Sequence, residues 1–480
     1  MKVYGLRLLD GRVTGSTDLV KNKLAHAATA SPRWASSEYN QTYAWCVNFS
    51  SGNFNNNNKY NSNVVRAVCE YENEVQSWVK AFYDCCKHKK TGHQCTLYRL
   101  FAEEDIPVLA YQAITRTYKP TTSTCFVVTR PKLREVFAAH FRDRVVQHWI
   151  CLRLEPLFEA RFESQGNVSF NCRVGFGTTA AVERLSDDMK FVSSFYTREA
   201  WVGKFDIRSF FMHIDCAILE ELLVPFIRQH YEGSDIETLI YLTTETIRHA
   251  PQNDCKRKGD LTLWDRLEPH KSLFYADPLT GMPIGNLTSQ LFANFYMSFF
   301  DGYILSECKK RGCRYVRFVD DFSITGAKKQ DIIDLYHLAS RYLSEKLHLE
   351  LHVDKFYLQE VKKGIKFVGS VIKQFRVYLG NRTVGSMYDA IIVLDRICKC
   401  VHSSNGANMM DLMSLERSVS AINSYFGFLI HCNSYAIRRA AFNKCKYFWK
   451  VCYVEGGYRK VKIKRKYTVA TKLLNDYGNI

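Results

Sequence analysis

Two adjacent carboxylates, Asp320 and Asp321, separate the apolar runs YVRFV and FSIT in the stretch RYVRFVDDFSITG, residues 314 to 326. Each run has the length and composition of a short strand, so the stretch predicts a hairpin with the acid pair at its turn. A hairpin that serves structure alone favours Asn-Gly or Asp-Gly there, because these residues tolerate positive φ. Adjacent carboxylates repel each other and are costly to desolvate unless a cation neutralises them. The pair therefore indicates a metal site, with an exposed Asp-Asp turn as the alternative.

A third carboxylate, Asp206, lies inside the apolar run of GKFDIRSFFMHID, residues 203 to 215. Its burial without a partner would be costly, and an N-cap or a structural ion pair is the alternative to a metal ligand. Together with the acid pair, Asp206 would complete a site for two Mg²⁺ ions, which prefer oxygen ligands and leave room for substrate phosphates. Two such ions can lower the pKa of an attacking 3′-hydroxyl and stabilise a leaving pyrophosphate. The chemistry indicated is nucleotidyl transfer.

Length and composition predict that most of the chain folds around these carboxylates. Its 480 residues predict two or three domains of about 100 to 200 residues, and a hydrophobic share of 46% supplies their cores. The net charge of +18, with basic residues interleaved among Tyr and Phe, predicts nucleic acid rather than a membrane as the partner. The N-terminus lacks the apolar stretch of a signal peptide, and no run of about 18 apolar residues follows, so we expect a cytoplasmic protein.

The seventeen cysteines are expected to be reduced core residues, because the chain is long and lacks a secretory signal. One cluster of possible soft ligands comprises Cys85, Cys86, His88, His93 and Cys95. It lacks the paired CxxC spacing that makes a zinc site specific, so a lysine-rich helix end is favoured over zinc.

Five segments, in order and spacing, resemble the motifs of reverse transcriptases over about residues 72 to 450. They are the first fingers motif at 130 to 162, motif A around Asp206 in FDIRSFF, motif B at 281 to 301, the YxDD box at 318 to 321, and motif D with the primer grip at 351 to 372. The box reads FVDD, with Phe318 in place of the usual Tyr, so the hydroxyl of that residue is absent while both carboxylates remain.

The resemblance implies an α/β fold of the right-hand polymerase type, with fingers, a palm with an antiparallel sheet, a helical thumb and a poorly ordered N-terminal extension. The expected divisions are 1–70, a lectin-tail-like extension largely without its own core; 71–200, N-terminal helices and fingers; 201–378, palm with a helical insertion at about 225–280; 379–450, thumb; and 451–480, a basic C-terminal tail. In the thumb, the spacing of Leu412, Leu415, Val419, Ile422 and Phe426 fits one face of a helix.

The resemblance also implies catalytic roles. Asp206 and Asp320 would hold Mg²⁺, with the carbonyl of Ile207 as a further ligand, and Asp321 would complete the acidic site. Lys355 matches the motif D lysine, a candidate proton donor to pyrophosphate, and a solvated lysine is the alternative.

Other positions would contact substrates. Lys132 and Arg134 are placed to meet the triphosphate. Phe211 would exclude a sugar 2′-hydroxyl and so favour dNTPs, with a palm-core role as the alternative. The expected template and primer contacts are Gly285, Asn286, Ser289, Phe318 and Gly369, and Gln290 is expected at the incoming nucleotide.

Motif B distinguishes subgroups of the family. Residues 284 to 290 read IGNLTSQ, the IGxxxSQ form typical of diversity-generating retroelements, whereas group II intron enzymes typically show QGxxxSP. The subgroup implies an RNA-directed DNA polymerase that copies a template repeat with errors opposite adenines. The alternatives are a non-mutagenic enzyme of the group II intron, retron or abortive-infection type, and a lectin-like binding module with an inactive polymerase part.

The N-terminal region bears on that choice. Residues 34 to 72 resemble the C-terminal end of the C-type lectin fold of retroelement target proteins, and residues 53 to 63, NFNNNNKYNSN, contain seven asparagines. Asparagine codons carry two adenines each, so our hypothesis is that residues 34 to 69 translate a template repeat; an Asn-rich disordered leader is the alternative. The fragment has too little apolar surface to form a stable lectin domain, although AWCVNF, residues 44 to 49, is expected to pair locally.

The expected partners are template RNA, the growing cDNA primer and dNTPs, bound in a basic cleft with strong salt dependence. A small basic helical accessory protein is also expected. The clusters at 85 to 90 and 458 to 466 are candidate contacts for RNA or for that protein.

Overall fold

The structure is a computed structural model of the chain. It describes residues 7–9, 12–14, 34–38, 43–48, 54–58, 62–87, 92–130, 132–406 and 408–469, with side chains from residue 74 onward. The first elements are β1 (Arg7–Leu9), β2 (Arg12–Thr14), β3 (Trp34–Glu38), β4 (Tyr43–Asn48) and β5 (Phe54–Asn58). Strand β4 pairs antiparallel with β3 and β5, which confirms the local pairing expected for AWCVNF. The side chains on which a core would depend lie outside the described residues.

The chain forms two compact units that interleave along the sequence. Unit 1 comprises residues 1–166, 208–300 and 342–350, and unit 2 comprises residues 167–207, 301–341 and 351–480. A composition change predicts a boundary at residue 70, whereas helix α2 (Ser62–Cys86) runs through it without a break.

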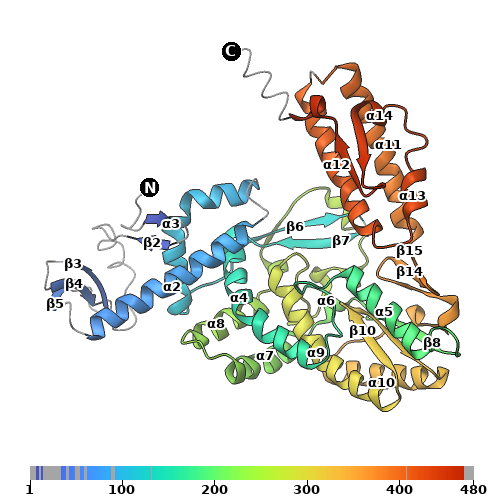
Figure 1. Cartoon of the computed structure of the whole chain (residues 1–480). Coiled ribbons are helices and arrows are strands. Elements are labelled where there is room, and N and C mark those ends of the chain that lie inside the picture. The colour runs from blue at the N-terminus through green and yellow to red at the C-terminus, as the bar shows by residue number, and fades with distance from the viewer. Residues whose placement is uncertain are drawn as a thin grey trace. The chain divides into compact units, whose positions relative to one another are not determined.

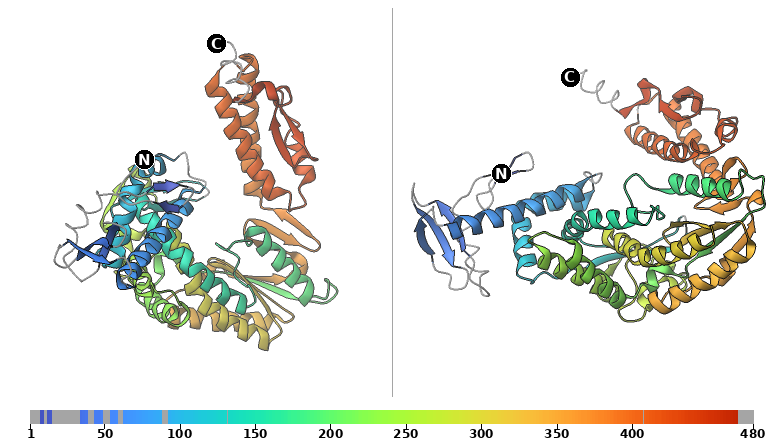
Figure 2. Two further views of the ribbon diagram at one scale, coloured as in Figure 1. Left: turned by 60° about the vertical axis from the view of Figure 1, so that its left-hand side comes forward. Right: turned by 60° about the horizontal axis from the view of Figure 1, so that its bottom comes forward.

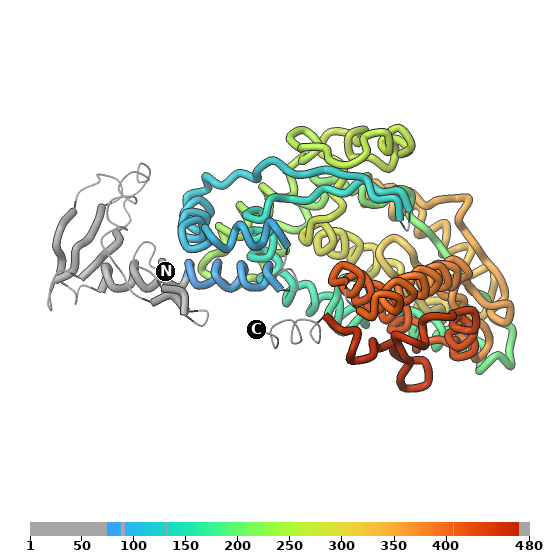
Figure 3. The backbone as a smooth tube through the Cα atoms, turned by 90° about the horizontal axis from the view of Figure 1, so that it is seen from above, coloured from blue at the N-terminus to red at the C-terminus, as the bar shows by residue number. Residues whose placement is uncertain are grey.

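Beyond the N-terminal strands β1 to β5, unit 1 consists of helices and the small sheet of β6, β7 and β9 (Figure 1). After α2 its elements are α3 (His93–Ile114), β6 (Ser123–Val128), β7 (Arg134–Ala138), α4 (Phe141–Ser164), α6 (Phe210–His213), α7 (Cys216–His230), α8 (Ile236–Arg248), β9 (Cys255–Arg257) and most of α9 (Leu287–Lys310). The strand order is β7-β6-β9, and β6 and β7 run side by side as a hairpin (Figure 3). Helices α2 and α4 meet at Trp78 and Trp149, whose rings stack with centroids 4.9 Å apart.

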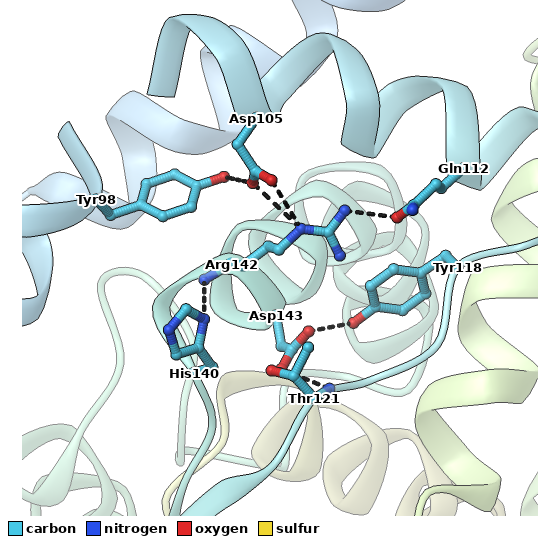
Figure 4. Close-up of polar contacts among 8 residues, drawn as sticks. All are labelled: Tyr98, Asp105, Gln112, Tyr118, Thr121, His140, Arg142 and Asp143. Atoms are coloured by element: carbon cyan, nitrogen blue, oxygen red, sulfur yellow. Dashed lines mark hydrogen bonds and ion pairs between the residues drawn. The ribbon is translucent and has the colours of Figure 1, made fainter. Parts of the chain in front are cut away.

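A polar network fixes the start of α4 against α3 and against the segment that leads into β6 (Figure 4). Arg142 Nε lies 3.1 Å from Asp105 Oδ1, and its Nη2 donates to Gln112. Asp143 is buried and accepts hydrogen bonds from the Tyr118 hydroxyl and from both the backbone N–H and the hydroxyl of Thr121. Arg142 therefore binds α3, whereas Asp143 binds the segment at Tyr118 and Thr121 that leads into β6. Together they fix the position of the β6–β7 hairpin relative to α3 and α4.

Unit 2 contains the four-stranded sheet β10-β11-β8-β12. Its strands are β8 (Trp201–Asp206), β10 (Arg314–Phe318), β11 (Asp321–Gly326) and β12 (Tyr357–Glu360), accompanied by α5 (Thr178–Val192) and most of α10 (Lys329–Leu347). Because side chains alternate along a strand, Val202 and Gly203 of β8 face opposite sides. Val202 packs in the cluster that contains Leu185 of α5, whereas Gly203 lies against Ile332 of α10. Apolar contacts on both faces of β8 thus give a sheet covered by α5 on one side and by α10 on the other.

The rest of unit 2 is a second small sheet followed by a mainly helical part. It comprises β13 (Ile365–Phe367), β14 (Ser370–Lys373), β15 (Arg376–Leu379), α11 (Asn381–Ser403), α12 (Met409–Leu429), α13 (Tyr435–Ala440), α14 (Phe448–Val451), β16 (Cys452–Glu455) and β17 (Lys460–Ile463). The predicted apolar face of residues 412 to 426 is buried, which confirms that helix face.

The stretch YRKVKIKRKY, residues 458 to 467, predicts a basic strand or tail, and the structure has the strand, because residues 452–467 are folded. Strands β16 and β17 form an antiparallel hairpin that lies along α11 and α12 (Figure 2). Cys452, Val461 and Tyr467 are buried in the same apolar cluster as α11 and α12. Lysines alternate with apolar residues in KVKIK, so one face of β17 is buried while the other carries charge.

The cysteines of the α2–α3 contact are core residues. Cys85, Cys86 and Cys95 are buried, and the Sγ atoms of Cys86 and Cys95 are 3.5 Å apart. Burial, reinforced by the contact with Cys95, raises the pKa of Cys86 and keeps its thiol protonated. His88 lies outside the described residues. Of the helices that the structure describes, none is both long and apolar enough to span a bilayer.

The contact between β8 and α10 gives a test of the fold. A methyl group added to Gly203 would lie 2.7 Å from Cγ2 of Ile332, so Gly203→Val should overpack this layer and destabilise the protein by about 1–3 kcal/mol. Gly385→Ala, in an open position of α11, should instead be stabilising by about 0.5–1 kcal/mol. Urea unfolding midpoints measure both effects. A Gly203→Val protein as stable as the wild type would show that α10 is not seated on β8 in this way.

Candidate active site

The β10–β11 hairpin and the end of β8 place the three predicted carboxylates at one end of the sheet of unit 2. Phe318 pairs with Asp321, which leaves Val319 and Asp320 as a two-residue turn. This confirms the predicted hairpin. Asp321 in turn pairs directly with Asp206 across β11 and β8, so these two side chains share one face at the end of the sheet.

The backbone around Asp206 is held from two sides. The Ile207 N–H donates to the carbonyl of Asp320 at 3.3 Å, and the His352 N–H donates to the carbonyl of Asp206 at 2.8 Å. Ile207 is buried and forms an isolated antiparallel bridge with Leu351. Backbone hydrogen bonds of the kind found between strands thus fix the main chain at Asp206 and Asp320. The positions from which their carboxylate side chains project are therefore fixed as well.

Like charges directly opposite each other are destabilising, and two lysines offset that repulsion. Lys355 Nζ donates to Asp206 Oδ2 at 2.6 Å, and Lys204 Nζ lies 3.2 Å from Asp321 Oδ1. Burial raises the pKa of Asp321, Lys204 opposes that change, and Asp206 adds to it. The site therefore places two carboxylates where positive charge is needed to keep both ionised.

Lys204 is a site residue that sequence reasoning missed. It lies two residues before Asp206 on β8, on the same face of the sheet. The sequence feature that could have identified it is a lysine inside an apolar strand. Burying the ammonium there costs free energy unless an acidic group pairs with it.

The donors present suit Mg²⁺. Asp321 Oδ1 is buried, and its contact with Lys204 is an ion pair without hydrogen-bond alignment. Carboxylate oxygens and the Ile207 carbonyl are hard ligands of the kind this ion prefers. Within the described residues, no three His, Cys, Asp or Glu side chains form a ready-made metal cage. Mg²⁺ does not require one, because it is commonly held by one or two carboxylates with water and substrate phosphates.

The proposed triphosphate contacts lie in unit 1, at the start of β7. Lys132 and Arg134 are exposed. Next to them Glu135 is buried and accepts hydrogen bonds from the Trp264 indole N–H, the Ser272 hydroxyl and the Leu273 N–H, at 2.9, 2.9 and 2.8 Å. The buried carboxylate anchors β7, and the basic side chains extend from that anchored strand.

The loop at residues 284 to 290, which resembles motif B, also contacts β7. The Phe137 N–H donates to the Ile284 carbonyl at 2.8 Å, and Gly285 has a φ of +121°. A Cβ on Gly285 would lie 2.6 Å from the Phe137 carbonyl oxygen, so only glycine fits this close approach. Asn286 and Ser289 are buried and line a polar pocket with Asp143 and His249, whereas Gln290 is exposed.

The remaining predicted site residues lie in mixed surroundings. Phe211 is half-buried, and its ring meets that of Phe210 edge-on at 5.2 Å, which suits either a core role or a sugar contact. Phe318 packs against the apolar cluster on the α5 side of the sheet. Gly369, with a φ of +83°, forms the β13–β14 turn together with Val368.

Comparison with known proteins shows only distant similarity. No protein-family model matches the chain. Protein YkfC of Escherichia coli (strain K12) is 21% identical over 314 residues, a match that covers 59% of this chain and 74% of YkfC.

Similar solved structures include two telomerases. The telomerase from Candida albicans in complex with a TWJ fragment of telomeric RNA is 12% identical with a TM-score of 0.41, and the match covers 70% of this chain and 61% of that one. Apo telomerase from Candida tropicalis is 13% identical with a TM-score of 0.41, covering 66% of this chain and 59% of that one. The chain thus spans less than two thirds of the length of these solved proteins.

Proposed function

We propose that this protein is an RNA-directed DNA polymerase. The observation that carries the proposal is the pairing of Asp206 with Asp321 across two strands, beside a turn that presents Asp320. Three carboxylates at one end of a rigid sheet suit nucleotidyl transfer, which needs oxygen ligands fixed in place and open space for phosphates. The choice of an RNA template and a DNA product rests on the resemblance of the five motifs to those of reverse transcriptases.

Each residue of the site has a role in this proposal. Asp206, Asp320 and the Ile207 carbonyl would hold two Mg²⁺ ions, which when bound lower the pKa of a 3′-hydroxyl and stabilise pyrophosphate. The Lys204 ammonium, 3.2 Å from Asp321 Oδ1, would favour the ionised form of that carboxylate. Lys355, whose ammonium already lies at the acid site, is the proposed proton donor to pyrophosphate.

Substrate contacts complete the proposal. Lys132 and Arg134 would bind the triphosphate, and Phe211 would exclude a 2′-hydroxyl from the sugar site. Template RNA and primer would bind through the positive charge of the chain, so binding should weaken steeply as salt rises.

The central test replaces one carboxylate without changing its shape. Asp320→Asn should reduce Mg²⁺-dependent DNA synthesis on a primed RNA template by at least about a hundredfold, because a neutral amide is a poor Mg²⁺ ligand. Asp187→Asn is the matched control, since Asp187 is an exposed acid of α5 in the same unit and forms an ion pair with Lys190. Near-wild-type synthesis by the Asp320→Asn protein would overturn the site assignment.

We further propose that the enzyme belongs to a diversity-generating retroelement and copies template adenines inaccurately. The support is the IGNLTSQ form of motif B, residues 284 to 290, with Gln290 exposed at the start of α9. Base discrimination is a difference of transition-state binding energies, so a changed contact at the nucleotide can loosen it. A non-mutagenic reverse transcriptase of the group II intron, retron or abortive-infection type is the second candidate.

The error pattern separates these candidates. The purified enzyme should copy an RNA template of balanced composition with misincorporations concentrated opposite adenines, at several times the frequency seen opposite the other bases. Sequencing of the cDNA products measures this ratio. Equal error frequencies opposite all four bases would favour the non-mutagenic candidate while leaving the polymerase assignment intact.

In the same proposal, the asparagine-rich segment matters through the nucleic acid that encodes it and not through the structure of the protein segment. We infer that the codons of residues 34 to 69 form, or overlap, the template repeat that the enzyme copies. A small basic helical accessory protein is the proposed protein partner, with residues 85 to 90 and 458 to 466 as candidate contacts for that protein or for RNA.

The neighbouring DNA tests the template inference. It should contain a near copy of the sequence that encodes residues 34 to 69, located at the end of another gene and differing mainly where this copy has adenine. Differences spread evenly over the four bases, or the lack of any near copy, would contradict the inference.

A further inference from the structure

A fully buried arginine lies directly beneath the acid turn of unit 2. Arg317, on β10, has 0% exposure, and its partner Asp301, in the last turns of α9, is equally buried. Nε and Nη2 of Arg317 donate to the two carboxylate oxygens of Asp301 at 2.7 and 2.6 Å. The Tyr315 hydroxyl donates to the same carboxylate at 2.7 Å. A bidentate pair with a third donor is a strongly oriented arrangement.

The third arm of the guanidinium reaches the turn itself. Nη1 of Arg317 donates to the carbonyl of Val319 at 3.0 Å, and Val319 is the residue immediately before Asp320. Arg317 pairs across the hairpin with Phe322, whereas Phe318 pairs with Asp321. Arg317 and Asp321 therefore lie on opposite faces of the sheet, so the arginine holds the turn from the side away from the acids.

Val319 needs such a restraint. Its φ is +58°, in the left-handed region, at the first turn position of a two-residue hairpin, where glycine is usual. A β-branched residue rarely adopts this conformation, and it persists only where the surroundings over-determine it. The hydrogen bond from Arg317 to the Val319 carbonyl supplies one such restraint at the residue whose peptide unit leads into Asp320.

The backbone of Arg317 is fixed as well. Its N–H donates to the Val168 carbonyl at 2.8 Å, and its carbonyl accepts from the Phe170 N–H at 3.0 Å. The arginine is thus held at both backbone and side chain before it contacts the turn. Buried ion pairs often add little to stability compared with apolar side chains of similar volume, so stability alone does not account for this group.

We propose that Arg317 is a positioning residue for the acid site: oriented by Asp301 and Tyr315, it fixes the Val319 carbonyl and thereby the direction in which Asp320 is presented. The proposal rests on the proposed function, in which Asp320 holds Mg²⁺. Lysine cannot replace arginine here, because a single ammonium cannot satisfy the planar carboxylate and the Val319 carbonyl in this geometry.

Enzyme kinetics test the proposal through its metal dependence. Arg317→Lys keeps the charge, and it should lower kcat by about ten- to a hundredfold and raise the Mg²⁺ concentration for half-maximal activity several-fold, with KM for dNTP near that of the wild type. Tyr315→Phe leaves the turn contact in place and should show a much smaller change. Arg438→Lys is the matched control, because Arg438 is a similarly buried arginine of α13 that bonds Ser434 and the Tyr458 carbonyl. It should leave the Mg²⁺ dependence unchanged.

Amide hydrogen exchange of residues 318 to 321 gives a second readout that needs no activity. Arg317→Lys should speed exchange in this turn by about tenfold or more, whereas Arg438→Lys should not. Wild-type Mg²⁺ dependence together with wild-type exchange in Arg317→Lys would overturn the proposal. An inactive wild-type protein would instead contradict the proposed function, and the exchange result would still decide whether Arg317 positions the turn.

Discussion

The acid site depends on one electrostatic constraint: Asp206 and Asp321 face each other across neighbouring strands, where two negative charges repel. Positive charge close to the two carboxylates offsets this repulsion. Lys355 and Lys204 each contact one of the two carboxylates. The need for positive charge also makes the site suited to divalent cations. The two carboxylates supply hard oxygen ligands, and a bound cation would neutralise them.

The surrounding elements can be understood as the means of keeping this unfavourable arrangement rigid. Helix α5 covers one face of the sheet and α10 covers the other, so the strands that carry the acids lie between two packed helices. Beneath the turn, the Arg317–Asp301 pair connects β10 to the C-terminal half of α9. The backbone strain at Val319 and the repulsion between Asp206 and Asp321 are thus confined to a few residues. The sheet, packed between α5 and α10, holds these residues in place.

The sequence predicted those parts of the molecule that local pattern encodes. The β10–β11 hairpin follows from two apolar runs around Asp320 and Asp321, and the buried face of α12 follows from helical spacing between Leu412 and Phe426. Partners distant in the chain were not predictable in this way. Lys204 meets Asp321 only through the β8–β11 register, and Arg317 meets Asp301 only through packing of α9 on the sheet. The basic stretch that contains KVKIK is compatible with a strand or a tail, and only the pairing with β16 decides for strand β17.

The most direct measurement of the central claim locates a metal ion. A crystal of the protein with primed template, dNTP and Mn²⁺ in place of Mg²⁺ should show an anomalous peak at about 2.0–2.2 Å from carboxylate oxygens of Asp206 and Asp320. Lys355 should then no longer contact Asp206 as it does at 2.6 Å. An anomalous map without a peak at these carboxylates, with both lysines still on them, would contradict the account.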